Sequence, residues 1–296
     1  MSPEPLDIKD LPERQRMAFY AALFAMANAD GETTREELNL VFETLDLDGL
    51  STSRAETVRG YAVSPPALEP SLRSLQNVDE RVRFGLALNL IDIAVVDDDI
   101  TEEENEALAE AFEILGVNEQ QMIEMVSFSA EMKRIRERGL DDNIAAKALK
   151  NATAGLAGVG VPIGAIYMCG SVLGLGAAGI TSGLAALGAF IGLAGMVPGI
   201  GVAIAIGGGV IWGVRKLTDA DGRRAKEGYQ RERERKAQLV IKNLQDTIVH
   251  IIERMTTLET KANESAANRK ALDDLRTRLS SLQKILRQRK ATAAHG

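Results

Sequence analysis

The chain lacks most of the residues on which enzymatic and disulfide-linked sites depend. Cys169 is the only cysteine, so neither an intrachain disulfide nor a thiolate zinc site can form. The two histidines, His250 and His295, have no His, Cys or Asp companion at a ligand or catalytic spacing. The sequence also contains no Walker A, Gly-x-Ser-x-Gly or HExxH motif. These absences argue against an enzyme.

Charge is absent from a long central span. Residues 151–214 contain no Lys, Arg, Asp, Glu or His, although 26% of the chain is charged. Net charge is −18 over residues 1–130, +2 over 131–150 and +9 over 215–296. We therefore divide the chain into an acidic head (1–130), a linker helix (131–150), an uncharged middle (151–214) and a basic tail (215–296). Segments of such different charge rarely belong to one globule.

The uncharged middle is long enough to cross a membrane twice, since one crossing needs about 20 apolar residues. Both of its flanks are rich in Lys and Arg, which places both ends in the cytoplasm under the positive-inside rule. We predict a two-helix transmembrane hairpin with crossings near Gly155–Leu175 and Leu187–Trp212. The first ten residues, MSPEPLDIKD, do not resemble a secretory signal, so the head is also expected in the cytoplasm, at a bacterial inner membrane.

Glycines recur at four-residue spacing in this segment, which holds 18 of the chain's 27. In lipid, small residues let helix backbones pack closely. In water, each would weaken a helix by up to about 1 kcal/mol relative to Ala. We therefore expect a homo-oligomer whose hairpins pack together in membrane lipid. The predicted packing pairs are Gly160/Gly164, Gly170/Gly174, Gly179/Gly183, Gly188/Gly192, Gly195/Gly199 and Gly209/Gly213.

The acidic head has apolar residues at helical spacing from Leu11 to about Phe128, which predicts an all-α fold. A short motif occurs twice within it. ANADGETTREE (27–37) aligns with AVVDDDITEEE (94–104), so that Asp30 matches Asp97, Thr34 matches Thr101 and Glu37 matches Glu104. Each matched pair is separated by the same number of residues as Asp30 and Asp97, and we call this separation the repeat offset. Each copy is predicted to end one helix and start another, which runs to a C-capping glycine, Gly49 or Gly116.

Two interpretations compete for the acidic residues of this motif. Thr34-x-x-Glu37 and Thr101-x-x-Glu104 both fit a capping box, in which the hydroxyl and the carboxylate satisfy the free amides of a helix start. The alternative is a divalent-cation site, because hard cations favour several carboxylate oxygens. Its ligands would be Asp30, Glu37, Asp97 and Glu104. The spacing does not match an EF-hand.

The two motifs resemble the TerB-like domain of tellurite-resistance and stress-response systems. They share an Ala-Asp-Gly-like turn with a Glu seven residues after the Asp, and the resemblance covers about 120 residues. It implies an all-α cytoplasmic module with an acidic, metal-binding face and a membrane-associated or cytoplasmic protein partner in stress or phage-defence operons. Asp30 with Glu37, and Asp97 with Glu104, match the motif. Asp98 stands where the family usually has Gly.

The basic tail contains two apolar stripes at heptad spacing, which predict a coiled coil. The stripes are Val240, Leu244, Ile248, Ile251, Met255 and Leu258, followed by Leu272, Leu275, Leu279, Leu282 and Leu286. Between them, Ala262–Asn268 is a weak point where two helices could fold back antiparallel. The basic run Arg223–Lys236 has two interpretations, contact with anionic lipid or a solvated helix face on which the charges of RERER pair with one another. Because interleaved aromatic residues are missing, nucleic acid is not an expected partner.

Together these features predict a membrane-anchored stress-response or phage-defence sensor or adaptor. Its acidic head binds a partner or a divalent metal ion, its hairpin oligomerises in the membrane, and both termini lie in the cytoplasm. Two alternatives stay open. In the first, the hairpins assemble into a pore that depolarises the membrane. In the second, the chain is a soluble coiled-coil scaffold.

Overall fold

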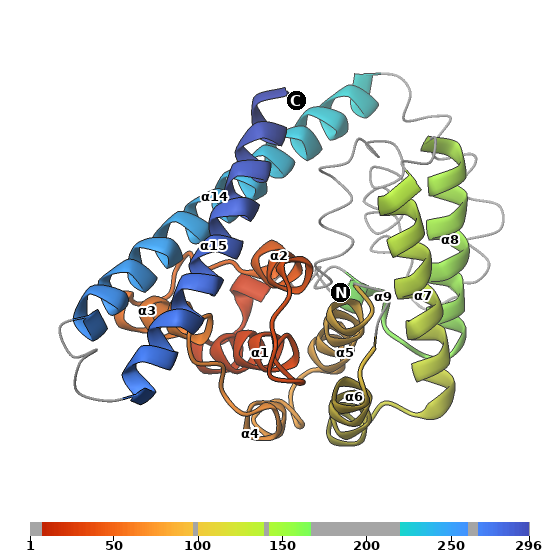
Figure 1. Ribbon diagram of the computed structural model, residues 1–296. Coiled ribbons are helices and arrows are strands. Elements are labelled where there is room, and N and C mark those ends of the chain that lie inside the picture. The colour runs from red at the N-terminus through yellow and green to blue at the C-terminus, as the bar shows by residue number, and fades with distance from the viewer. Residues whose placement is uncertain (1–7, 97–99, 139–141, 167–219, 260–265, 296) are drawn as a thin grey trace.

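The computed structural model describes residues 8–96, 100–138, 142–166, 220–259 and 266–295. Within these ranges every regular element is a helix, which confirms the all-α prediction. Figure 1 shows a helical head against which a long pair of C-terminal helices packs. No helix in the described ranges combines the length and the apolar character that a membrane crossing needs.

The head is built from two three-helix units. The first unit contains α1 (Glu13–Met26), α2 (Arg35–Thr44) and α3 (Thr52–Tyr61). The second unit contains α5 (Glu80–Ala94), α6 (Glu102–Leu115) and α7 (Glu119–Arg138). Each helix of the second unit begins one repeat offset after its counterpart in the first unit. The repeat seen in the two acidic motifs, 27–37 and 94–104, therefore extends over all three helices of each unit. A short 3-10 turn (Ile8–Asp10) precedes the first unit, and α4 (Leu68–Arg73) connects the two.

In each unit, an arginine of the first helix binds the chain at or just after the end of the second helix. Arg16, in the first turn of α1, donates from Nη2 to the carbonyl oxygen of Asp48 at 2.9 Å. Arg83, its counterpart in α5, donates from Nη1 to the carbonyl oxygen of Leu115. Arg83 lies one repeat offset after Arg16, and Leu115 lies one repeat offset after Asp48, so the two hydrogen bonds are equivalent. Leu115 is the last residue of α6, and the final carbonyls of a helix lack partners within it, so Arg83 stabilises this helix end. Asp48 lies in the loop after α2, which Arg16 holds against α1.

The core of the head lies between α1 and α5, the first helices of the two units. Phe19 and Tyr20 of α1 are fully buried, as is Leu86 of α5. The Tyr20 hydroxyl donates to the carbonyl oxygen of Asp46 at 2.7 Å and accepts from the Asp46 amide at 3.0 Å. This buried hydroxyl is therefore satisfied, and it fixes the loop that follows α2.

The first part of the uncharged middle folds as part of the head. Helix α8 (Asp142–Gly158) packs on α7, and the short α9 (Ile163–Ile166) packs on α5. Leu156, Val161 and Ile166 are buried in the core. The first predicted crossing, Gly155–Leu175, therefore does not start where we expect, because α8 ends at Gly158 and Gly160 has a left-handed φ of 81°. The expected boundary at residue 151 likewise lies within α8, and the head boundary at 130 lies within α7.

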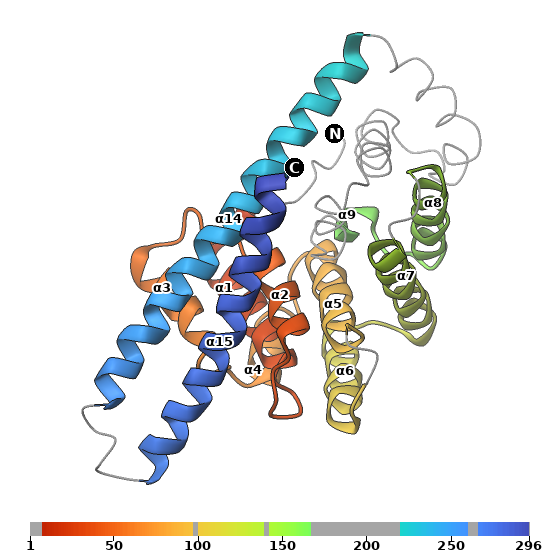
Figure 2. The same cartoon turned by 45° about the horizontal axis from the view of Figure 1, so that its top comes forward.

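The two C-terminal helices form an antiparallel hairpin on the first unit. They are α14 (Ala220–Glu259) and α15 (Ala266–His295), and we call them the C-terminal hairpin (Figures 1 and 2). Their apolar stripes face inward, as the heptad spacing predicts, and Leu244, Ile251 and Leu282 join the core of the head. Helix α14 contacts α2 and α3, and α15 contacts α2. Head and tail thus share one core, which the opposite charges of the two segments did not lead us to expect.

Candidate functional site

The first acidic turn is a capping box at the start of α2. The Thr34 amide donates to Glu37 Oε2 at 2.7 Å, and the Glu37 amide donates to Thr34 Oγ1 at 3.2 Å. The Glu37 side chain is buried, with 3% of the residue exposed. Asp30 lies in the turn before it and accepts the Glu32 amide at 2.9 Å. Gly31, with a φ of 87°, gives this turn its left-handed residue.

The second acidic turn repeats this geometry at the start of α6. The Thr101 amide donates to Glu104 Oε2 at 2.8 Å, and the Glu104 amide donates to Thr101 Oγ1 at 3.2 Å. Glu104 is 4% exposed. Both predicted capping boxes are therefore confirmed. A buried carboxylate oxygen that already accepts from the helix start is poorly placed to serve as a metal ligand.

The predicted metal site is only partly within the described residues. Asp30, Glu37 and Glu104 are described, whereas Asp97 and Asp98 lie outside the described ranges. Among the described residues, no group of three or more His, Cys, Asp or Glu side chains is arranged to hold a metal ion. The capping role accounts for Glu37 and Glu104 without a metal, and the four-carboxylate site stays a prediction.

The glycines at the ends of the predicted repeats behave differently in the two units. Gly116 caps α6 in the left-handed conformation, with a φ of 70°, as predicted. Gly49 also has a positive φ, of 78°, but α2 ends at Thr44 and its C-cap is Leu45. The prediction for Gly49 as a helix cap is therefore wrong. It occupies a turn in the loop between α2 and α3 instead.

Of the glycines predicted to pack in the membrane, only the first pair lies in the described residues. Gly160 is in the turn after α8, and Gly164 is in α9. The turn conformation of Gly160 is not that of a continuous crossing helix. The other ten lie outside the described ranges, namely Gly170, Gly174, Gly179, Gly183, Gly188, Gly192, Gly195, Gly199, Gly209 and Gly213.

A polar contact with several hydrogen bonds joins the C-terminal hairpin to the first unit. Arg289 donates from Nε and Nη2 to Asn39 Oδ1, at 3.1 and 2.9 Å, and Nη2 also pairs with Glu43. The Arg289 and Glu43 side chains are only 19% and 8% exposed. Burial lowers the pKa of the Arg289 guanidinium, which nevertheless stays charged at any working pH. The pair is thus a largely desolvated ionic contact.

Hairpin side chains also cap the helices of the first unit. Arg278 donates to the carbonyl oxygen of Ala62, the C-cap of α3, at 3.0 Å, and to Asn28 Oδ1 at 2.8 Å. Asn243, which is 1% exposed, donates to the carbonyl oxygen of Leu45, the C-cap of α2, at 3.0 Å. Burial lowers the pKa of Arg278, and the nearby Asp274 opposes this shift. The hairpin therefore completes hydrogen bonds that α2 and α3 cannot make alone.

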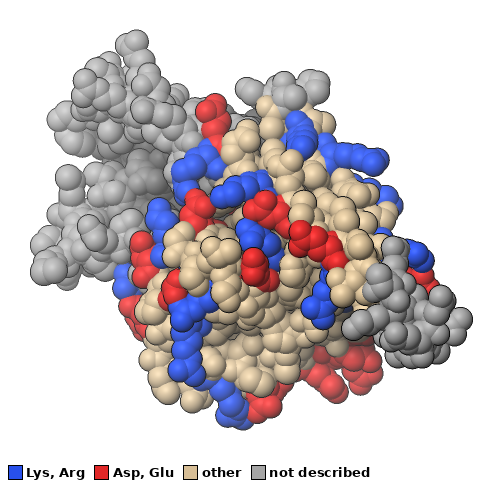
Figure 3. All heavy atoms as spheres, turned by 90° about the vertical axis from the view of Figure 1, so that its left-hand side faces the viewer, with Lys and Arg blue, Asp and Glu red and all other residues tan. Residues whose placement is uncertain are grey.

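Ion pairs at the edge of this interface join α14 to the head, with the basic partner on the head in one pair and on α14 in the other two. Arg59 pairs with Asp246 at 2.8 Å, while Arg235 pairs with Asp46 at 3.8 Å. Lys242 lies 3.7 Å from Asp48. On the face of the molecule seen in Figure 3, Lys and Arg side chains alternate with Asp and Glu. Exposed pairs of this kind contribute little each, typically below about 1 kcal/mol.

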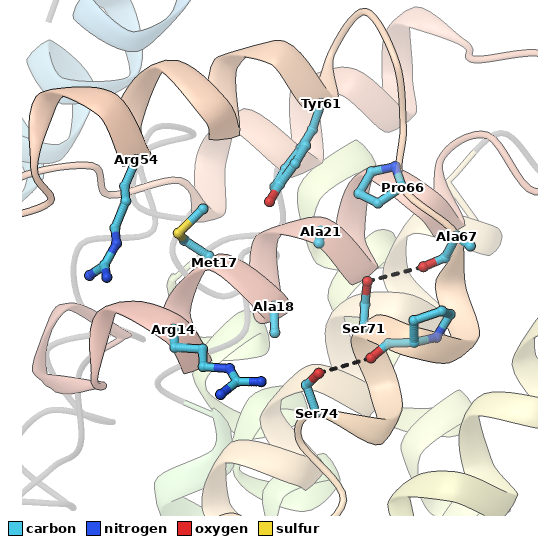
Figure 4. A pocket seen from close by; sticks show the side chains of 11 residues that line it. Arg14, Met17, Ala18, Ala21, Arg54, Tyr61, Pro66, Ala67, Ser71 and Ser74 are labelled. Atoms are coloured by element: carbon cyan, nitrogen blue, oxygen red, sulfur yellow. Dashed lines mark hydrogen bonds between the residues drawn. The ribbon is translucent and has the colours of Figure 1, made fainter.

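A surface pocket of about 390 Å³ lies between α1, α3 and α4. Tyr61 points into it from α3, and Arg14 lies along its opposite wall (Figure 4). Burial raises the pKa of the Tyr61 hydroxyl. Ser71 and Ser74 donate to backbone carbonyls of α4, at 3.0 and 2.9 Å, so neither hydroxyl is held by a base. The eleven lining residues include no His, Cys, Asp or Glu, and this pocket offers no acid–base pair.

Sequence reasoning missed the arginines that organise these contacts. Arg16 and Arg83 are separated by the repeat offset, so extending the alignment of the acidic turns outward would have found them. Arg278 and Arg289 carry no comparable signal, because each lies next to other charged or polar residues on a basic helix. Their importance depends on burial against a segment that is remote in the sequence.

Comparison with protein-family models, with curated proteins and with solved structures found no match to this chain.

Proposed function

We propose that the chain is a membrane-anchored adaptor or sensor in a bacterial stress or phage-defence response. Its helical body lies in the cytoplasm, and residues 167–214 cross the inner membrane twice. The TerB-like resemblance of the two acidic turns supports the type of response. The membrane role is supported by the unbroken uncharged sequence that follows Ile166 and continues to Val214. This length still suffices for two crossings of about 20 residues.

The observation that carries the proposal is that both flanks of this segment belong to one folded body. Helix α9, which ends at Ile166, packs on α5. Helix α14 returns to the same head and packs on α2 and α3. Both ends of an intervening membrane segment must then lie on one side of the bilayer, which requires an even number of crossings. This argument is independent of the positive-inside rule and agrees with it.

Helix α14 has the composition expected beside a lipid surface. Its first turns extend beyond the head in Figures 1 and 2, and they hold the basic run Arg223–Lys236. A Lys or Arg near an anionic membrane contributes about 1 kcal/mol of binding free energy. We therefore place the start of α14 at the cytoplasmic surface of the membrane and the rest of the hairpin on the head.

Labelling of Cys169 with a membrane-impermeant maleimide tests this proposal. The purified full chain is labelled before and after reconstitution into vesicles of anionic and zwitterionic lipid. We expect the thiol to lose its reactivity on reconstitution, because lipid excludes the polar reagent. The matched control is Cys169→Ser with Ser280→Cys, which places the thiol on an exposed position of α15 and should label equally in both samples.

The outcomes separate the proposal from its two alternatives. Equal labelling of Cys169 with and without vesicles would refute a membrane segment and favour a soluble scaffold. Protection of Cys169 together with the collapse of a membrane potential, reported by a voltage-sensitive dye in the same vesicles, would favour a pore. An adaptor requires protection of the thiol with the potential intact.

A further inference from the structure

The first unit binds the C-terminal hairpin through a defined surface. The internal repeat shows where the equivalent surface lies in the second unit. In the first unit, Asn39 and Glu43 of α2 contact Arg289, and Arg59 of α3 contacts Asp246. The repeat offset carries these three positions to Glu106 and Glu110 of α6 and to Val126 of α7. The chain therefore contains a second face of the same construction, and we call these three residues together with Ile123 the second-unit face.

The second-unit face is uncovered, although its counterpart is not. Glu106 and Glu110 are exposed, and Val126 is 42% exposed, whereas the Arg59 side chain in the first unit is 18% exposed. Ile123, one turn before Val126, is 56% exposed. Helix α8 does not cover this face, since it packs on the side of α7 where Gln121 donates to the carbonyl oxygen of Val159.

The chemistry of this face defines what it would bind. Residues 100–130 contain eight Glu and no Lys or Arg. The second-unit face thus combines exposed carboxylates on α6 with two exposed aliphatic side chains on α7, which are one helical turn apart. An interface on this surface needs a partner surface that carries both basic and apolar side chains, because charge complementarity guides encounter while apolar burial supplies affinity.

The C-terminal hairpin exposes side chains of both kinds, apolar ones on α14 and basic ones on α15, and we call the surface that carries them its outward face. Val249 and Ile252 of α14 are exposed at 54% and 44%, also one turn apart. Lys284, Arg287 and Lys290 of α15 are exposed. The hairpin and the α6–α7 pair lie on opposite sides of the head in Figures 1 and 2, so one molecule cannot bring its own two surfaces together.

We propose that the second-unit face binds the outward face of the C-terminal hairpin of a second copy of this chain. The contact would join copies of the chain through their helical bodies, and it does not depend on the membrane insertion of the proposed function. The contact joins two different surfaces, so it would either occur twice across the axis of a two-fold dimer or repeat head-to-tail around a closed ring.

Charge reversal on the two faces tests this contact. Glu106→Lys with Glu110→Lys reverses the acidic face, and Lys284→Glu with Arg287→Glu reverses the basic one. The full chain in mild detergent is followed by sedimentation velocity over a range of protein concentrations and salt. We expect the wild-type chain to self-associate more weakly as salt rises, and each reversal to weaken association by about tenfold or more.

Mixing the two variants gives the decisive result. Each reversed face then meets a reversed partner, so association should return in the mixture, although neither variant associates alone. Glu32→Lys with Glu69→Lys is the matched control for the acidic-face reversal, because it changes net charge equally at exposed positions outside the second unit. Circular dichroism checks that each variant is folded, and a misfolded variant could not rescue its partner.

Three results would overturn the proposal: a wild-type chain that is monomeric at every concentration, association that the reversals leave unchanged, or mixtures that stay monomeric. A monomeric chain that bound a basic amphipathic peptide through Glu106 and Glu110 would assign the face to another protein. Cys169 labelling in vesicles distinguishes this failure from that of the membrane proposal, because the charge reversals should leave the protection of the thiol unchanged.

Discussion

Arg289→Ala should release the C-terminal hairpin from the first unit. The substitution removes every donor that Arg289 gives to Asn39 and Glu43 and leaves the Glu43 carboxylate, 8% exposed, without its cation. The second carboxylate oxygen, Oε2, is already buried with no partner in the described part of the chain. An unpaired charge in such surroundings is the main cost of breaking a buried ion pair.

The expected loss follows from the burial of the two partners. Removing one partner of a fully buried pair costs about 3–5 kcal/mol, and removing one from an exposed pair costs below about 1 kcal/mol. Because Arg289 is 19% exposed and Glu43 is 8% exposed, we expect about 3 kcal/mol. Arg289→Lys should recover only part of this, since an ammonium cannot replace the planar fork that reaches both acceptors.

Urea unfolding of the purified full chain, followed by circular dichroism, measures this loss. Hydrogen exchange of the α14 and α15 amides shows whether it arises in the hairpin. Lys290→Ala is the neighbouring control, and because Lys290 is exposed it should change stability by less than about 0.5 kcal/mol. Adding Glu43→Gln to Arg289→Ala should restore about 1 kcal/mol or more, since a neutral amide is cheaper to leave buried. An Arg289→Ala loss no larger than that of the control would refute the reasoning.

Two further predictions concern the repeated turns. Thr34→Ala and Thr101→Ala should each lower the unfolding free energy by about 1 kcal/mol, and the corresponding Ser variants should retain the caps; equal effects of Ser and Ala in urea unfolding would show that the hydroxyls do not cap. Gly49→Ala and Gly116→Ala should each cost about 1–2 kcal/mol, because both glycines have positive φ. Gly116→Ala should lose more stability than Gly49→Ala, because its Cβ would lie 3.0 Å from Arg83 Nη1 while Gly49 has open space around it. A lower thermal stability of the Gly49→Ala variant would contradict this.

Local features of the head were predictable because short-range chemistry determines them. A Thr followed three residues later by Glu forms a capping box wherever a helix starts, so Thr34 and Thr101 could be assigned from the sequence. Gly116 could be assigned as a C-cap for a similar reason. Gly49 could not, because α2 ends early at Thr44, where its C-cap Leu45 is held by Asn243 of the hairpin. Tertiary contact overrides the local signal at that position.

The start of the proposed membrane segment could not be predicted from the sequence, for a different reason. Absence of charge is compatible with lipid and equally with a protein core, and residues 151–166 illustrate the second case. Leu156 and Ile166 are fully buried against the head, and a turn at Gly160 separates α8 from α9. Hydropathy alone could not place this boundary, because it does not report which surface buries the apolar residues.

The head and the tail have opposite net charges, which led us to expect separate bodies. In the folded chain these charges attract the two segments to one another. The acidic loop after α2 and the basic α14 are close in space, although Asp48 and Lys242 are far apart in sequence. Loop length contributes little to the cost of such a contact, about 0.6 kcal/mol for each doubling. Attraction between the segments and the buried Arg289–Glu43 pair can therefore hold them together across a long insertion. A chain built in this way tolerates a long segment between α9 and α14 at a small cost in free energy.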